Sequence, residues 1–268
     1  MKAKVLNLEG VAGKDVQLPK QFDAEYRPDL IKRAVLAIQS HNMQPYGAKT
    51  DAGLRASADL SRRRRKYRGS YGKGISRVPR KIMSARGSQM NWTGAIVSGT
   101  VGGRRAHPPK SLKDLELKIN IKERKKALVS AIAATANKEL VLKRGHKAPE
   151  NIPLIIDNSF EKLSKTKDVV KTLEKLGLTK ELERTKEKKV RAGKGKNRGR
   201  KYKKKKGPLL VVSSKCALEK SAASIPGVDI VEVKSLNTEL LAPGTIAGRL
   251  SLWTVGAIEK LDKEKLFI

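Results

Sequence analysis

Apolar and polar positions follow two different periods along most of this chain. Residues 2–9 alternate apolar and polar side chains, which predicts a short strand, and residues 11–21 predict a turn-rich second arm of a hairpin. Apolar residues recur at helical spacing over residues 28–38, where a proline suits the first turn, and again over residues 121–136. The first half of the chain therefore predicts a hairpin and two amphipathic helices.

The second half of the chain alternates short apolar runs with helical patterns. Strands are predicted at residues 153–156, 208–213, 228–233 and 249–254, and helices at residues 164–176, 215–224 and 255–261. Short apolar strands that alternate with helices are typical of a parallel sheet that is buried on both faces. We therefore predict an α/β fold with a mostly parallel, Rossmann-like sheet and helices on both faces.

Residues 45–109 interrupt this pattern, because apolar periodicity disappears and glycine, serine and basic residues take over. Asp51 and Asp59 are the only acidic residues in this stretch. About 65 residues without regular elements are uncommon inside a compact domain unless they are functional or disordered. Because helical patterns precede and follow the stretch, we predict a long, extended basic loop inserted into a globular α/β domain formed by residues 1–44 and 110–268.

A second basic insertion is predicted within the globular domain at residues 188–206. It contains twelve Lys and Arg, three glycines and no acidic residue. Such a run cannot bury apolar area and its charges repel one another, so we expect it to be disordered in the absence of a polyanion.

The charge of the whole chain indicates an anionic partner. Lys and Arg number 60 against 26 Asp and Glu, which gives a formal net charge of +34. Basic side chains that neutralise phosphates release condensed counterions, so nucleic acid is the expected partner. An anionic membrane is the alternative, but no stretch places large apolar residues opposite a basic face. With no apolar run long enough for a membrane span or a signal peptide, we expect no membrane partner and a cytoplasmic location.

The residues that usually carry catalysis or bind metals are few and scattered. Cys216 is the single cysteine, which excludes an internal disulfide and a C-x-x-C zinc pair, and we expect a half-buried, unreactive thiol. His41, His107 and His146 are not near a recognisable nucleophile, and we expect them to be solvated or to face RNA. Residues 10–13, after the first strand, lack the spacing of a dinucleotide-binding turn. We therefore predict no catalytic residue, no metal and no cofactor.

Arginine, glycine and aromatic residues are interleaved in the first insertion. Arginine supplies planar, bidentate donors for phosphate, glycine permits close backbone approach, and aromatic rings offer faces for unpaired bases. A solvated basic tail is the alternative, but this segment is held by predicted helices at both ends. Across the two insertions, the residues predicted to bind RNA are Arg55, Arg62, Arg63, Arg64, Arg65, Lys66, Tyr67, Arg68, Tyr71, Lys73, Arg77, Arg80, Lys81, Arg86, Trp92, Arg104, Arg105, Lys194, Lys196, Arg198, Arg200 and Lys201.

Two motifs in the first insertion carry a resemblance to a known family. Residues 72–79 read Gly-Lys-Gly-Ile-Ser-Arg-Val-Pro, and residues 102–109 read Gly-Gly-Arg-Arg-Ala-His-Pro-Pro. With the helix at residues 120–134 and the order of strands around the loop, the chain resembles the universal large-subunit ribosomal protein L-four family in its archaeal and eukaryotic form. The resemblance covers essentially the whole chain. The long C-terminal extension of eukaryotic members is absent, which favours an archaeal member.

This resemblance implies a structural constituent of the large ribosomal subunit rather than an enzyme. It implies early binding to large-subunit rRNA during assembly, contacts with neighbouring ribosomal proteins, and a loop tip within residues 66–90 that lines the nascent-peptide exit tunnel. Residues 86–92 depart from the glycine-rich run that members often show there. From the residues alone, the alternatives are an RNA-modifying or processing enzyme on a Rossmann-like sheet and a DNA-compacting protein.

Overall fold

The computed structural model describes every residue of the chain except Tyr67, Ser88 and Ile268. The described residues form two compact units. The first, here called the body, consists of residues 1–42 and 116–268, and the second, here called the basic segment, consists of residues 43–115.

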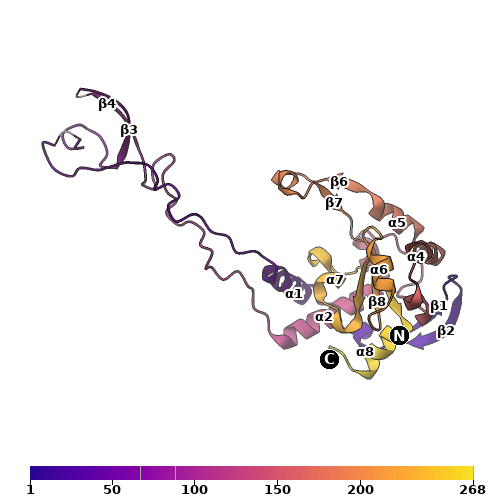
Figure 1. Cartoon of the computed structure of the whole chain (residues 1–268). Coiled ribbons are helices and arrows are strands. Elements are labelled where there is room, and N and C mark those ends of the chain that lie inside the picture. Colours follow the sequence, from indigo (N-terminus) through magenta and orange to yellow (C-terminus); the bar gives the residue numbers. More distant parts are fainter. Residues whose placement is uncertain (67, 88, 268) are drawn as a thin grey trace. The chain divides into compact units, whose positions relative to one another are not determined.

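The body contains a six-stranded sheet with the strand order β2-β1-β5-β10-β8-β9. Figure 1 labels β1, β2 and β8 of this sheet. Its strands are β1 (Lys2–Leu6), β2 (Ala12–Gln17), β5 (Leu154–Ile156), β8 (Leu209–Val212), β9 (Asp229–Glu232) and β10 (Ser251–Thr254). β2 pairs with β1 in the antiparallel direction, and every other pair of neighbours is parallel. The prediction of an α/β fold around a mostly parallel sheet is confirmed.

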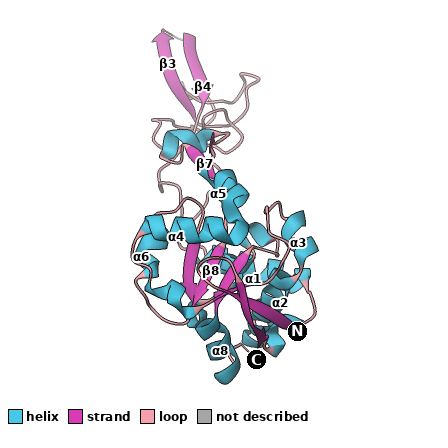
Figure 2. Cartoon of the chain, turned by 90° about the vertical axis from the view of Figure 1, so that its right-hand side faces the viewer, coloured by secondary structure: helices cyan, strands magenta, loops and turns pink. Residues whose placement is uncertain are grey.

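Helices cover both faces of this sheet (Figure 2). One face packs against α1 (Pro28–His41), α2 (Ile121–Ala136), α7 (Thr238–Leu241) and α8 (Val255–Lys263), and the other against α3 (Lys138–Lys143), α4 (Thr166–Leu173), α5 (Thr179–Lys186) and α6 (Leu218–Ala223). Leu209 and Val211 of β8 belong to the first cluster, and Leu210 and Val212 to the second. Because successive strand side chains point to opposite faces, this four-residue strand has to be apolar throughout.

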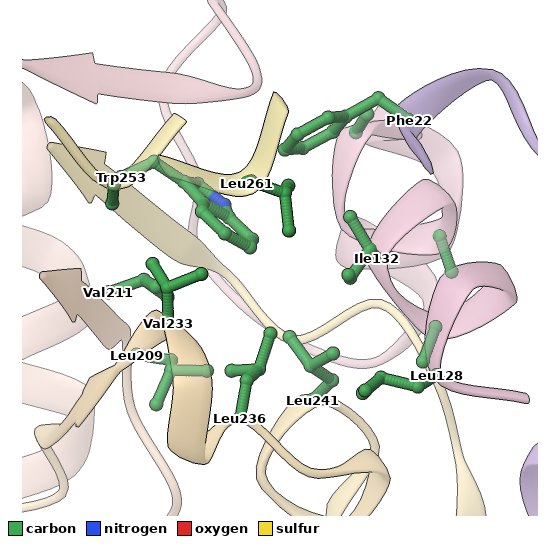
Figure 3. Close-up of a cluster of buried hydrophobic side chains, with 14 of the residues drawn as sticks. Phe22, Leu128, Ile132, Leu209, Val211, Val233, Leu236, Leu241, Trp253 and Leu261 are labelled. Carbon is green, nitrogen blue, oxygen red and sulfur yellow. The ribbon is translucent and has the colours of Figure 1, made fainter. Parts of the chain in front are cut away.

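Trp253 of β10 is the largest side chain that is fully buried in the first cluster (Figure 3). Its ring centroid lies 5.2 Å from that of Phe22 at an interplanar angle of 71°, an edge-to-face arrangement that aromatic pairs favour. The indole Nε1–H donates to Oγ of Ser251 at 2.9 Å, so the buried polar atom is satisfied. Figure 3 shows Ile132 and Leu261 beside these rings, which joins α2 and α8 to the sheet.

The helix predicted at residues 164–176 is shorter than expected and a second helix follows it. α4 ends at Leu173, a distorted turn spans Glu174–Leu178, and α5 begins at Thr179. Gly177 has φ +81° in this turn, a conformation that favours glycine. The sequence did not predict α5, because Leu182 is its single apolar residue and leaves no periodic pattern.

Residues 188–206, here called the basic hairpin, contain regular structure. β6 (Lys188–Val190) pairs antiparallel with β7 (Tyr202–Lys204), and a short helical turn at Lys194–Arg198 joins them. The expectation of disorder is therefore wrong, because the two arms satisfy one another's backbone groups. Arg191 N–H extends this pairing by donating to the carbonyl of Lys201 at 2.8 Å.

The basic segment also contains strands that the sequence did not predict. β3 (Arg80–Arg86) and β4 (Gln89–Gly94) form an antiparallel hairpin with an irregularity between Ile82 and Ser84. β3 is mostly exposed and shows no apolar alternation, whereas in β4 the half-buried Met90 and Trp92 alternate with polar residues, a pattern too short to have been assigned as a strand. Among all described residues, no helix is long and apolar enough to cross a membrane.

Candidate nucleic-acid interface

Glycines allow two parts of the basic segment to pack backbone against backbone. Gly53 has φ +79°, and a Cβ atom there would lie 2.5 Å from Cα of Arg104. A Cβ atom at Gly103 would lie 2.0 Å from the carbonyl oxygen of Val97. Neither position accepts a side chain without moving the backbone, so Gly103 of the motif at residues 102–109 has a structural role in the packing of the basic segment.

Most of the residues predicted to bind RNA in the basic segment are exposed. The exposed members are Arg55, Arg62, Arg63, Arg64, Arg65, Lys66, Arg68, Tyr71, Lys73, Arg77, Lys81, Arg86, Arg104 and Arg105, whereas Arg80 and Trp92 are half-buried and Tyr67 lies outside the described residues. Arg55 forms an ion pair with Asp51 at 2.6 Å. Within the described part of the chain, Arg62, Arg63, Arg64 and Arg65 form no ion pair, so these four guanidinium groups are available to an external anion.

Aromatic rings in the basic segment lie beneath cations. The guanidinium of Arg77 lies 5.1 Å from the ring centroid of Tyr71, and both Arg80 and Lys73 lie 5.6 Å from that of Trp92. These distances are within the range of cation–π attraction. The structure therefore brings five of the residues predicted to bind RNA into contact with one another, namely Tyr71, Lys73, Arg77, Arg80 and Trp92.

Arg80 is held in place beside Trp92 by hydrogen bonds. Its guanidinium donates to the carbonyl oxygen of Ser76 at 2.7 Å and to the Oγ atom of the same residue at 2.9 Å. A planar cation that is already fixed loses less conformational entropy when it binds a ligand.

A cavity of about 510 Å³ lies beside Trp92 in the basic segment. Its walls include Asp59, Ser61, Lys66, Arg68, Arg80 and Trp92. Sequence analysis identified the basic and aromatic members of this wall but missed Asp59 and Ser61. The available signal was the position of Asp59 as an isolated acidic residue before a long acid-free stretch.

The basic hairpin presents a second set of predicted RNA-binding residues, in the body. Lys194, Lys196, Arg198, Arg200 and Lys201 are all exposed. The Nζ atom of Lys201 lies 5.6 Å from the ring centroid of Tyr202, an aromatic residue that the sequence prediction omitted. The signal for Tyr202 was its position within a lysine run, the same pattern that singled out Tyr67.

Buried charged residues fix the base of the basic hairpin. Glu181 of α5 is fully buried and accepts from Arg184 at 2.6 Å, from Nδ1 of His146 at 2.6 Å and from the backbone N–H of Lys147 at 3.0 Å. Arg184 also donates to the carbonyl oxygen of Lys206 at 2.6 Å. The expectation that His146 is solvated or faces RNA is therefore wrong, because its ring is buried and its Nδ1 atom is paired with the buried carboxylate of Glu181.

The pKa values in this network follow from its geometry. Burial alone would raise the pKa of Glu181, but the hydrogen bonds from Arg184, His146 and Lys147 outweigh it and lower the pKa to about 2. Burial lowers the pKa of His146 and outweighs the opposing effect of Glu181. At neutral pH, Glu181 is ionised and His146 is neutral, so the neutral imidazole donates its Nδ1–H to the carboxylate.

Arg249 fixes the chain directly after the basic hairpin. This side chain is fully buried and donates to the carbonyl oxygens of Gly207 at 2.8 Å and Leu240 at 3.0 Å, and to the carboxylate of Asp229 at 2.6 Å. A buried arginine is tolerated only when its donors are satisfied and its charge is paired. Arg184 and Arg249 thus hold residues 206–207 to the body, which positions the hairpin that precedes them.

Metal-ligating and nucleophilic side chains are scattered in the part of the chain that the structure describes. Across the described residues, no three His, Cys, Asp or Glu side chains are grouped so as to hold a metal ion. The thiol of Cys216 is half-buried, as predicted, and burial raises its pKa, which disfavours the reactive thiolate. The exposed cations and the aromatic rings beside them are therefore the candidate functional site.

Comparison with known proteins agrees with this arrangement. Residues 16–264 match the family model described as ribosomal protein L4/L1 family. The chain belongs to the ribosomal protein L4/L1 family. The family membership predicted from the motifs at residues 72–79 and 102–109 is confirmed. The prediction of a structural ribosomal protein rather than an enzyme is confirmed as well.

Archaeal members of the L4/L1 family are similar to the chain over nearly its whole length. The large ribosomal subunit protein uL4 of Nanoarchaeum equitans is 49% identical over 268 residues, which is 100% of both chains. The protein of the same name from Archaeoglobus fulgidus is 48% identical over 98% of this chain and 99% of its own. That from Methanocaldococcus jannaschii is 49% identical, with the same coverage of 98% and 99%. The predicted resemblance to the archaeal type is confirmed.

Proposed function

We propose that this protein is built into the large ribosomal subunit, where the basic segment and the basic hairpin bind rRNA. The observation that carries the proposal is the exposed run Arg62 to Arg65, with guanidinium groups that form no ion pair within the described part of the chain. Phosphate is the ligand that best matches several planar, bidentate donors close together. The name of the archaeal relatives, large ribosomal subunit protein, indicates which RNA supplies it.

In this proposal, residues 45–109 act as an extended loop inserted into a Rossmann-like domain of residues 1–44 and 110–268. The exposed cations of the loop, together with Tyr67 and Tyr71, contact rRNA early in assembly, and its tip within residues 66–90 lines the exit tunnel beside the nascent peptide. The exposed cations of residues 188–206 contact rRNA from the globular domain. Neighbouring ribosomal proteins pack against the remaining surface of that domain, and the protein resides with ribosomes in the cytoplasm.

Salt dependence of binding tests the phosphate contacts directly. If about eight phosphates are neutralised, the log–log dependence of affinity on salt should have a slope near −6, which is about three decades between 50 and 200 mM salt. Filter binding of the full chain to large-subunit rRNA fragments measures this slope. A slope near zero would rule out anchoring through phosphates, and equal competition by duplex DNA would indicate a DNA-compacting protein instead.

A further inference from the structure

The cavity beside Trp92 has the size of a site for a small organic group. Its volume of about 510 Å³ lies within the ~300–1,000 Å³ that is typical of ligand sites. Trp92 of β4 pairs across the hairpin with Ile82, and Asp59 forms an isolated backbone bridge with Arg80. Asp59 therefore lies against the β3–β4 hairpin through its own backbone.

Two planar groups in the wall of the cavity offer stacking surfaces. The Cζ atom of the Arg80 guanidinium lies 5.6 Å from the ring centroid of the half-buried Trp92. Hydrogen bonds to Ser76 hold this guanidinium in place. Unpaired RNA bases stack on aromatic rings and on arginine planes, and each stacked base contributes substantially to affinity. This part of the wall therefore suits a flat heterocycle.

Asp59 distinguishes the cavity from a simple phosphate site. Its side chain is exposed and forms no ion pair with any described residue, although Lys66 and Arg68 line the same cavity. A carboxylate repels phosphate and accepts hydrogen bonds from N–H groups through two oxygens. Among the four RNA bases, guanine presents two adjacent donors, N1–H and N2–H, on its Watson–Crick edge. A carboxylate can accept both at once.

We propose that this cavity binds an unpaired guanine of RNA, and that Asp59 determines the preference for that base. The ring stacks on Trp92 and Arg80, its Watson–Crick donors meet the Asp59 carboxylate, and Lys66 and Arg68 contact the flanking phosphates. This inference rests on the proposed RNA-binding function and adds a base preference to it.

Binding of the full chain to three RNA heptamers tests the guanine site. The heptamers are uridine throughout, uridine with a central guanosine, and uridine with a central adenosine. We expect the guanosine heptamer to bind about tenfold more tightly than the other two, because a bidentate contact discriminates by this order. Asp59→Asn should reduce the preference to less than twofold. Asp51→Asn, which changes the charge equally but lies outside the cavity, should retain it.

Tryptophan fluorescence provides a second readout for stacking. Trp253 is fully buried in the body, so its emission should not respond, whereas the guanosine heptamer should quench Trp92. Trp92→Phe should abolish the quenching and retain the preference for guanosine, whereas Trp92→Ala should lose the preference. Similar affinity of the wild-type chain for all three heptamers, or an unchanged preference in Asp59→Asn, would overturn the guanine site and leave RNA binding intact. Absence of binding to any heptamer while rRNA fragments are still bound would overturn the guanine site alone, and absence of binding to heptamers and rRNA fragments would overturn both proposals.

Discussion

At the scale of single residues, Glu181 has the most consequential environment in the body. It is fully buried, ionised, and hydrogen-bonded to Arg184, His146 and Lys147. Removing one partner of a buried charge pair is strongly destabilising, because the remaining charge is left without compensation. The network therefore ties the stability of the body to the position of the basic hairpin.

We predict that Glu181→Gln lowers the free energy of unfolding by about 3 kcal/mol at neutral pH. The pKa of Glu181 is lowered from 4.5 to about 2, so its stabilising contribution is present above pH 4.5 and is lost as the pH falls towards 2. The lowered pKa of His146 acts in the same direction, since a neutral buried imidazole stabilises the fold at higher pH and this contribution fades below pH 6.5. Urea unfolding followed by circular dichroism at pH 7 and pH 3 measures both effects.

Glu183→Gln is the matched control for this prediction, because Glu183 is exposed on the same helix. It should change the free energy of unfolding by less than about 0.5 kcal/mol at either pH. The difference between wild type and Glu181→Gln should shrink at pH 3. A difference that stays constant from pH 7 to pH 3 would show that the ionised carboxylate is not the source of the effect.

At the scale of elements, the sequence predicts those that bury an apolar face. The runs that became β5 and β8 are continuously apolar because both faces of the sheet are covered, and all four residues of β10 are likewise buried. β3 was not predicted because its side chains remain mostly exposed and give no apolar period, and β4 was missed because its alternation rests on only two apolar residues, Met90 and Trp92. His146 was misjudged for a different reason. Its local sequence is polar, and its burial depends on Glu181, which is 35 residues away.

The residues predicted to bind RNA also differ in whether the local sequence reveals them. Composition alone selected the arginine run and the aromatic residues of the basic segment, because these residue types have few other uses when they are concentrated together. Asp59 was missed because its significance depends on the cavity that it shares with Trp92 and Arg80. Sequence spacing does not reveal such a contact.

We predict that the basic hairpin contributes several phosphate contacts of its own. Replacing Lys194, Lys196, Arg198, Arg200 and Lys201 by serine should reduce the magnitude of the salt slope for rRNA binding by about 3.5, at roughly 0.7 for each lost contact. Filter binding at several salt concentrations measures this change.

An equal loss of charge elsewhere on the body serves as the control for the hairpin variant. The control variant replaces the exposed lysines Lys162, Lys165, Lys167, Lys171 and Lys180 by serine. It should change the salt slope by less than 1. If the two variants lowered the slope equally, net charge rather than the hairpin would account for binding.

At the scale of the whole molecule, the body and the basic segment are stabilised in different ways. The body buries two apolar clusters on opposite faces of one sheet and supplies the stability. The basic segment buries little, and its described cations are largely exposed, so much of its order in the ribosome has to come from contacts with RNA. A net charge of +34 is the composition expected of a chain that is completed by a polyanion.

Footprinting of rRNA on intact large subunits tests this account most directly. Subunits that carry the full chain are compared with subunits in which residues 62–92 are replaced by a short glycine-serine linker. The account predicts that nucleotides of the exit tunnel lose protection in the variant, while protections due to the body remain. Unchanged protection of the tunnel nucleotides would contradict the assignment of the basic segment as the rRNA-binding and tunnel-lining part of the molecule.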